Sequence, residues 1–283
     1  MPATATPTAR FGIALPGGGS GPLTASSLAD AARQIEAAGF TSAWAFDSIG
    51  RGFLLADPLT ALAVAGTVTR TLELGTGVLQ VPLRHPVELA QRVLTTHLVT
   101  GGRLRLGVGA GSTAADFEAL GLDFAGRFKR LGESLDIMRR LWKGERVNGA
   151  SLEPVWPAAL GGPPVFIGSW AGSRWIERAA REFDGWVGSG ARSSWRALQE
   201  GIKRFRDLGG RRAIVTNVVV NLESPTASLT GPDDPYDLKC PKDVARERLH
   251  HLMTLGYDDI VFVARRHDAA YLQELRELTL SAR

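Results

Sequence analysis

Residues 72–111 read LELGTGVLQVPLRHPVELAQRVLTTHLVTGGRLRLGVGAG and contain a complete strand–helix–strand pattern. A short apolar run, Leu72–Leu79, precedes a segment of helical periodicity, Pro86–Val99, which has proline in its first turn. A second apolar run follows at Leu104–Val108. Short apolar runs that alternate with longer helical segments are typical of βαβ units, so the strands are expected to lie parallel in one sheet.

The same alternation continues along the chain in both directions. The predicted strands are Phe11–Leu15, Ser42–Phe46, Leu72–Leu79, Leu104–Val108, Pro164–Gly168, Gly185–Gly188, Ala213–Val220 and Asp259–Ala264. The predicted helices are Ala25–Ala38, Pro58–Thr69, Pro86–Val99, Arg127–Trp142, Arg174–Phe183, Ser194–Leu208, Lys242–Leu255 and Ala269–Leu280. Several begin at proline or end at glycine, which are the usual start and stop signals of helices.

The number of these pairs predicts an α/β protein with one (β/α)8 TIM barrel over residues 10–283, preceded by a loose tail over residues 1–9. An open doubly wound sheet is the competing architecture. Such sheets have fewer strands and a tight glycine-rich turn after the first strand, whereas here a longer Pro- and Gly-rich loop, residues 16–22, occupies that position. The longest irregular stretch, Asn221–Cys240, is interpreted as a lid over the active site.

The composition is that of a globular protein, with 44% hydrophobic and 22% charged residues. The net charge of +4 comes from basic residues that alternate with acids along predicted helices, which indicates solvated helix faces and no nucleic-acid partner. The single cysteine, Cys240, allows no internal disulfide and is interpreted as incidental. Because no long apolar run or leader-like segment is present, we expect a cytoplasmic protein that does not act on membranes.

Active sites of (β/α)8 barrels lie at the C-terminal ends of the strands, and here those positions are mostly neutral, small or aromatic. Such a surface suits a flat, partly apolar organic cofactor. A metal site is not expected, because the five histidines form neither an H-x-H nor an H-E-x-x-H pattern. A serine hydrolase is not expected either, because the G-x-S-x-G turn is absent.

Two of these strand ends carry recognisable signals. The glycines of Gly107–Gly111 allow close backbone approach to a ligand, although a crowded barrel rim would use glycine too. Ser169–Ser173 joins a strand end to a helix start, where an anion such as phosphate binds favourably. The alternative is that Ser173 only caps that helix. Trp44, Trp170 and Trp186 are either core or pocket residues.

The chain resembles the luciferase-like monooxygenase family. The resemblance is carried by Leu74–Pro86, Leu89-Ala90, Thr100–Gly111, Phe117–Gly121, Arg127, Glu133, Leu141-Trp142, Pro163–Gly168, Ala179-Ala180 and Phe183–Trp186. It covers roughly residues 10–190 and implies a (β/α)8 barrel that binds FMN or the deazaflavin F420 and acts on a small organic substrate. The small positive net charge favours the polyanionic F420 slightly. Family members are often dimers, so a homodimer is one state that the resemblance allows.

The resemblance also implies roles for individual residues. A cis peptide bond at Gly77–Val78 would lie behind the cofactor ring, and Gly109, Ala110 and Gly111 would lie near the ribityl chain or phosphate. Ser169, Trp170, Gly172 and Ser173 would hold the phosphate.

The second strand shows one departure from the family pattern. Many relatives have an acid–histidine pair at its end, whereas this chain has Asp47-Ser48. Asp47 and Ser48 are therefore the candidate catalytic residues, and the alternative for Asp47 is a structural acceptor. The missing histidine argues against glucose-6-phosphate dehydrogenase-like activity. Two alternatives stay open: a non-catalytic flavin or F420 binder, and a cofactor-free barrel enzyme acting on a sugar phosphate.

Overall fold

Eight parallel strands form a closed barrel in the computed structural model, which describes residues 9–17, 23–24, 26–49, 51–153, 156–225 and 233–283. The strands of the wall are β1 (Arg10–Ala14), β2 (Ser42–Ala45), β3 (Glu73–Thr76) with its continuation β4 (Leu79–Gln80), β5 (Leu104–Gly109), β6 (Val165–Gly168), β7 (Gly185–Ser189), β8 (Arg212–Asn221) and β10 (Asp259–Val263). β10 pairs with β1 on one side and with β8 on the other, which closes the ring. The prediction of a single-domain (β/α)8 barrel is confirmed.

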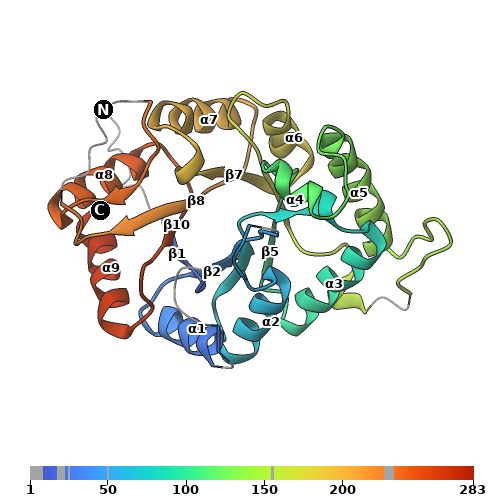
Figure 1. Cartoon of the computed structure of the whole chain (residues 1–283), viewed down its shortest axis with the longest axis horizontal. Coiled ribbons are helices and arrows are strands. Elements are labelled where there is room, and N and C mark those ends of the chain that lie inside the picture. The colour runs from blue at the N-terminus through green and yellow to red at the C-terminus, as the bar shows by residue number, and fades with distance from the viewer. Residues whose placement is uncertain (1–8, 18–22, 25, 50, 154–155, 226–232) are drawn as a thin grey trace.

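Helices surround the strands as an outer ring (Figure 1). They are α1 (Ser27–Ala37), α2 (Pro58–Val68), α3 (Pro86–Val99), α5 (Arg127–Trp142), α6 (Trp175–Glu182), α7 (Trp195–Asp207), α8 (Lys242–Thr254) and α9 (Ala269–Ser281). A short additional helix, α4 (Ala114–Glu118), was not predicted. None of the helices within the described ranges has the length and apolar character needed to cross a bilayer.

The third strand is interrupted, which the sequence pattern alone did not indicate. The predicted strand Leu72–Leu79 is divided into β3 and β4, and the break lies at a cis peptide bond between Gly77 and Val78. β4 regains its pairing with β5 through Leu79–Val108 and Gln80–Gly109. The cis bond implied by the family resemblance is therefore confirmed, at the expected residues.

Trp44 fills the interior of the barrel near β1 and β3. A Cβ atom at Gly12 would lie 3.0 Å from the indole, and one at Gly75 would lie 2.3 Å from it, so both neighbouring strands leave space for the ring. Trp44 packs with Phe166, Val187, Ile214 and Val261 in one buried cluster. Trp186 is buried in the main core, so both tryptophans are core residues.

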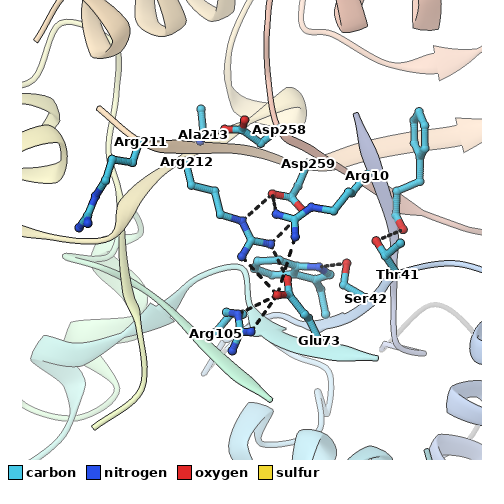
Figure 2. Close-up of polar contacts among 12 residues, drawn as sticks. Arg10, Thr41, Ser42, Glu73, Arg105, Arg211, Arg212, Ala213, Asp258 and Asp259 are labelled. Atoms are coloured by element: carbon cyan, nitrogen blue, oxygen red, sulfur yellow. Dashed lines mark hydrogen bonds and ion pairs between the residues drawn. The ribbon is translucent and has the colours of Figure 1, made fainter. Parts of the chain in front are cut away.

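The N-terminal ends of the strands are joined by a cluster of ion pairs. Arg10, Glu73, Arg212 and Asp259 are the first residues of β1, β3, β8 and β10, and Arg105 is the second residue of β5 (Figure 2). Arg212 bonds to both carboxylates, and Arg105 pairs with Glu73 at 2.8 Å. Because this end lies opposite the expected active site, the cluster serves the stability of the barrel.

The predicted lid, Asn221–Cys240, is only partly described. Residues 226–232 lie outside the described residues, as do residues 1–8 of the predicted tail and Ala25 of the first predicted helix. The second half of the segment packs against the barrel: β9 (Leu238–Lys239) pairs with β8, and Tyr236 is fully buried, with its hydroxyl donating to the carbonyl of Arg248. The interpretation of the whole segment as a lid is thus wrong for residues 236–240, because Tyr236, Leu238 and Cys240 are buried in the core.

Candidate functional site

A cavity of about 720 Å³ opens at the C-terminal ends of the strands. Residues from every strand end of the ring line it, as the sequence predicted for this architecture. They include the predicted site residues Asp47, Ser48, Gly77, Val78, Gly109, Ala110, Gly111, Ser169, Trp170 and Ser173. Gly172 is the one predicted residue absent from the lining, although a Cβ atom placed there would meet nothing within 4 Å.

Val78 is held between two glycines on the floor of the cavity. A Cβ atom at Gly109 would lie 2.8 Å from Val78 Cγ2, and one at Gly168 would lie 2.7 Å from Val78 Cγ1. Both distances are shorter than normal carbon contacts, so side chains at these positions would displace Val78. The glycines at the ends of β5 and β6 therefore serve first to seat Val78, which leaves its side chain as part of the apolar floor.

The Asp47 carboxylate is hydrogen-bonded to other residues of the protein. Its side chain is 1% exposed, and Arg84 donates to both carboxylate oxygens at 2.6 and 2.9 Å. The backbone N–H of Gln80 donates to Oδ2 at 2.8 Å. This geometry is that of a structural acceptor, which was the alternative interpretation of the sequence, and it does not support the tentative catalytic role of Asp47. Ser48 lines the cavity next to it.

A second buried carboxylate continues this network. Asp116, in the unpredicted helix α4, is fully buried and accepts two hydrogen bonds from Arg51 at 2.9 and 2.6 Å. Gln80 Nε2 donates to Asp116 at 2.9 Å. Although burial alone would raise the pKa of Asp116, the hydrogen bonds from Arg51 and Gln80 hold it below its ordinary value. The network fixes the loops that follow β2 and β4.

The wall at the end of β6 has the features expected of an anion site. Ser169, Trp170 and Ser173 line the cavity there, and Trp170 is 47% exposed. Ser173 Oγ accepts from the N–H of Trp175, the first residue of α6, which agrees with the capping alternative, although Arg174 is the residue directly before the helix. The Ser169 hydroxyl is buried, with no hydrogen-bond partner within the described residues. A buried hydroxyl of this kind is uncommon and suits a bound ligand.

Asn217 is a cavity residue that was not among the predicted site residues. It interrupts a run of β-branched residues in β8, adopts a positive φ of 56°, and lines the cavity. The signal was present in the sequence as the single amide within Ile214–Val220.

The charged residues of the cavity wall are mostly arginines. Arg51, Arg192, Arg265 and Arg266 line it together with one acid, Asp47. Arg265 and Arg266 both lie 3.4 Å from the carboxylate of Glu223. Within the described ranges, the structure contains no group of three or more side chains suited to a metal ion.

A family model described as luciferase-like monooxygenase matches residues 9–221. The chain belongs to this family. Over 115 residues it is 37% identical to 4-hydroxyprotoasukamycin monooxygenase of Streptomyces nodosus subsp. asukaensis, an alignment that covers 40% of this chain and 31% of that protein. Over 144 residues it is 35% identical to an F420-dependent glucose-6-phosphate dehydrogenase of Nocardia farcinica, which covers 46% of this chain and 41% of that protein. The chain thus matches less than half the length of either relative.

Solved structures of low sequence identity share the fold of this luciferase-like chain. Monooxygenase RslO1 from Streptomyces bottropensis superposes with a TM-score of 0.75 at 18% identity, covering 96% of this chain and 98% of that one. The oxygenating constituent of 3,6-diketocamphane monooxygenase from Pseudomonas putida, in complex with FMN, gives 0.74 at 18% identity and covers 96% of each chain. An F420-dependent secondary alcohol dehydrogenase gives 0.74 at 14% identity, covering 97% of this chain and 99% of that one.

Proposed function

We propose that this chain is an oxidoreductase that binds FMN or F420 and acts on a small organic substrate. The observation that carries the proposal is the cavity at the C-terminal strand ends, where the apolar floor at Val78 and the polar wall at Ser169 face one space. The family membership and the relatives that depend on F420 support it.

The residues present fit such a cofactor. The buried Ser169 hydroxyl has no partner among the described residues, and the open space beside Gly172 lies just before the start of α6. Helix starts attract anions through their N–H groups and dipole. We therefore assign Ser169, Trp170, Gly172 and Ser173 to the phosphate, and Gly77, Val78, Gly109, Ala110 and Gly111 to the ring and its side chain.

The roles of the protein side chains are to bind, orient and shield the reacting groups. When bound, F420 would supply hydride transfer, and FMN would supply electrons for oxygen chemistry. Asp47 is the only carboxylate among the described lining residues, and Arg84 neutralises it. This arrangement favours a reaction that takes no proton from a side chain of the second strand.

The test is a titration of purified apo-protein with FMN and with F420, in which fluorescence quenching reports binding. We expect a dissociation constant below roughly 100 μM for at least one of them, since weaker binding would be worth less than about 5.5 kcal/mol. Ser169→Ala should weaken binding, whereas Ser26→Ala, an exposed residue that makes no capping bond at α1, should not. If neither cofactor binds, the proposal is wrong.

A non-catalytic flavin or F420 binder is the second candidate function. The pairing of Asp47 with Arg84 favours this second function, because the described part of the cavity wall presents no other carboxylate or histidine. Mixing the reduced cofactor–protein complex with oxygen and with panels of small organic substrates separates the two functions. Conversion of any organic substrate at the expense of the reduced cofactor would exclude the carrier function, whereas oxidation of the reduced cofactor by oxygen alone would not.

A further inference from the structure

Asn217 is turned into the cavity by an irregularity in β8. Ile260 of β10 pairs with Val215, but Phe262 pairs with Val218, so β8 contains one extra residue between the two pairs. Such bulges redirect a side chain and are frequent beside active sites. Asparagine adopts positive φ more readily than the β-branched residues around it, which explains an amide at this position.

Two neighbouring acceptors fix the orientation of the Asn217 amide. Its Nδ2 lies 3.4 Å from the carbonyl oxygen of Gly77 and 3.2 Å from Thr216 Oγ1. The Gly77 oxygen can only accept, and the Thr216 hydroxyl already donates to the carbonyl of Gly188 at 3.2 Å. The nitrogen of the amide must therefore point to these two groups. Its Oδ1 is left without a hydrogen-bond partner within the described residues, and Asn217 lines the cavity.

The Asn217 amide joins two strands on opposite sides of the cavity floor, which lies at the mouth of the barrel. Gly77 follows β3 and Asn217 lies in β8, and these strands are not neighbours in the ring. The contact between them therefore crosses the mouth of the barrel, close to Val78.

A hydrogen-bond donor lies next to the open acceptor. Ser189, the last residue of β7, pairs in register with Thr216, the residue before Asn217. The Ser189 hydroxyl is buried and has no hydrogen-bond partner within the described residues. The neighbouring strands β7 and β8 thus offer one donor and one acceptor, which together complement a group that carries an N–H beside a carbonyl. The imide edge of the pyrimidinedione ring in FMN and F420 is such a group.

We propose that Asn217 binds the cofactor ring by accepting a hydrogen bond from its imide N–H at Oδ1, while Ser189 donates to the adjacent ring carbonyl. The inference rests on the proposed function. It adds that the ring is recognised by Ser189 at the end of β7 and Asn217 at the bulge of β8, in addition to the floor at Val78 and the phosphate wall at β6.

The test combines one variant with one modified ligand. Asn217→Gly retains access to positive φ and removes the amide. Asn148→Gly is the matched control, because Asn148 also has a positive φ, 50°, and does not line the cavity. The probes are FMN and F420, each with its analogue methylated at the imide nitrogen, and the readout is the dissociation constant from fluorescence quenching.

We expect wild-type protein and Asn148→Gly to bind the methylated analogue roughly ten-fold more weakly than the parent, as for loss of one hydrogen bond in a desolvated site. Asn217→Gly should bind the parent roughly ten-fold more weakly and bind both ligands about equally. Equal binding of parent and analogue by the wild type overturns the inference without any variant, as does an Asn217→Gly protein that still discriminates. If the wild type binds neither FMN nor F420, both the inference about Asn217 and the proposed function are wrong.

Discussion

At the residue scale, Asp47 and Gly109 show that positions expected to contact a ligand also hold other residues of the protein in place. The Asp47 carboxylate accepts from Arg84 and from the Gln80 backbone. Gly109 leaves space for Val78. Both residues line the cavity, so each affects binding through the neighbour that it holds.

Asp47→Asn should destabilise the protein by about 3 kcal/mol, because it leaves the nearly buried Arg84 without its main counter-charge. Urea unfolding measures the change. Asp30→Asn is the control: Asp30 pairs with Arg33 in α1, with both side chains more than half exposed, and should cost less than about 1 kcal/mol. An Asp47→Asn protein of wild-type stability that had lost only activity would instead return Asp47 to a catalytic role.

Gly109→Ala should push Val78 toward the cavity, because the new Cβ would lie 2.8 Å from Val78 Cγ2. We expect a stability loss of about 1–3 kcal/mol and weaker binding of FMN or F420. Thermal unfolding and fluorescence quenching measure the two effects. Gly172→Ala should keep stability within about 0.5 kcal/mol, since its Cβ would meet nothing. Equal stability of both variants would show that Val78 is not confined.

At the element scale, the strands are held together at the end opposite the cavity by the cluster around Glu73 (Figure 2). Although burial alone would raise the pKa of Glu73, the hydrogen bond from Arg212 and the charges of Arg212, Arg105 and Arg10 lower it. A carboxyl whose pKa is lower in the folded state stabilises the fold above its ordinary value of 4.5. That contribution is lost as the pH falls through the folded-state pKa.

Glu73→Gln should therefore cost about 3 kcal/mol at pH 7, because three arginines lose a shared counter-charge. Below pH 4.5 the difference from wild type should shrink, since the carboxyl of the unfolded chain takes up a proton there, and it should disappear as the pH falls through the lower pKa of the folded state. Urea unfolding at a series of pH values from 7 to 3 gives both quantities. Glu133→Gln, whose partner Lys129 is exposed, should change stability little at any pH. A difference that does not depend on pH would contradict the role given to the Glu73 charge.

The eight helices of the outer ring and most strands could be predicted to within one or two residues, because apolar periodicity and Pro or Gly punctuation specify them locally, whereas the short helix α4 was missed. The exceptions depend on contacts between distant residues. The break between β3 and β4 came only from the family resemblance, and the extra residue in β8 is visible only in its pairing with β10. The segment ending at Cys240 lacks periodicity, yet Tyr236 and Leu238 are fully buried, because packing against β8 and α8 determines their position.

At the scale of the whole molecule, closure of the ring brings the ends of all its strands around one cavity. The barrel prediction therefore located nearly all the candidate residues together, although they span residues 47–173. The barrel prediction could not identify the hydrogen-bond partner of each side chain. Arg84 is distant from Asp47 in sequence and meets it across neighbouring strands. Asn217 is more distant still from Gly77, and the closed barrel brings these two residues into contact.

Cofactor binding should stabilise the entire barrel, because the cavity exists only when all strand ends are assembled. FMN or F420 at about one hundred times its dissociation constant should add about 2.7 kcal/mol and raise the melting temperature by roughly 5 °C or more. Riboflavin, or the phosphate-free F420 chromophore, should give less than about half that shift at equal concentration, since it leaves the wall at Ser169 unused. Ser169→Ala should reduce the shift from FMN while leaving that from riboflavin unchanged. Identical shifts from FMN and riboflavin in the wild type would show that the phosphate is not bound at the start of α6, and differential scanning fluorimetry is sufficient to measure them.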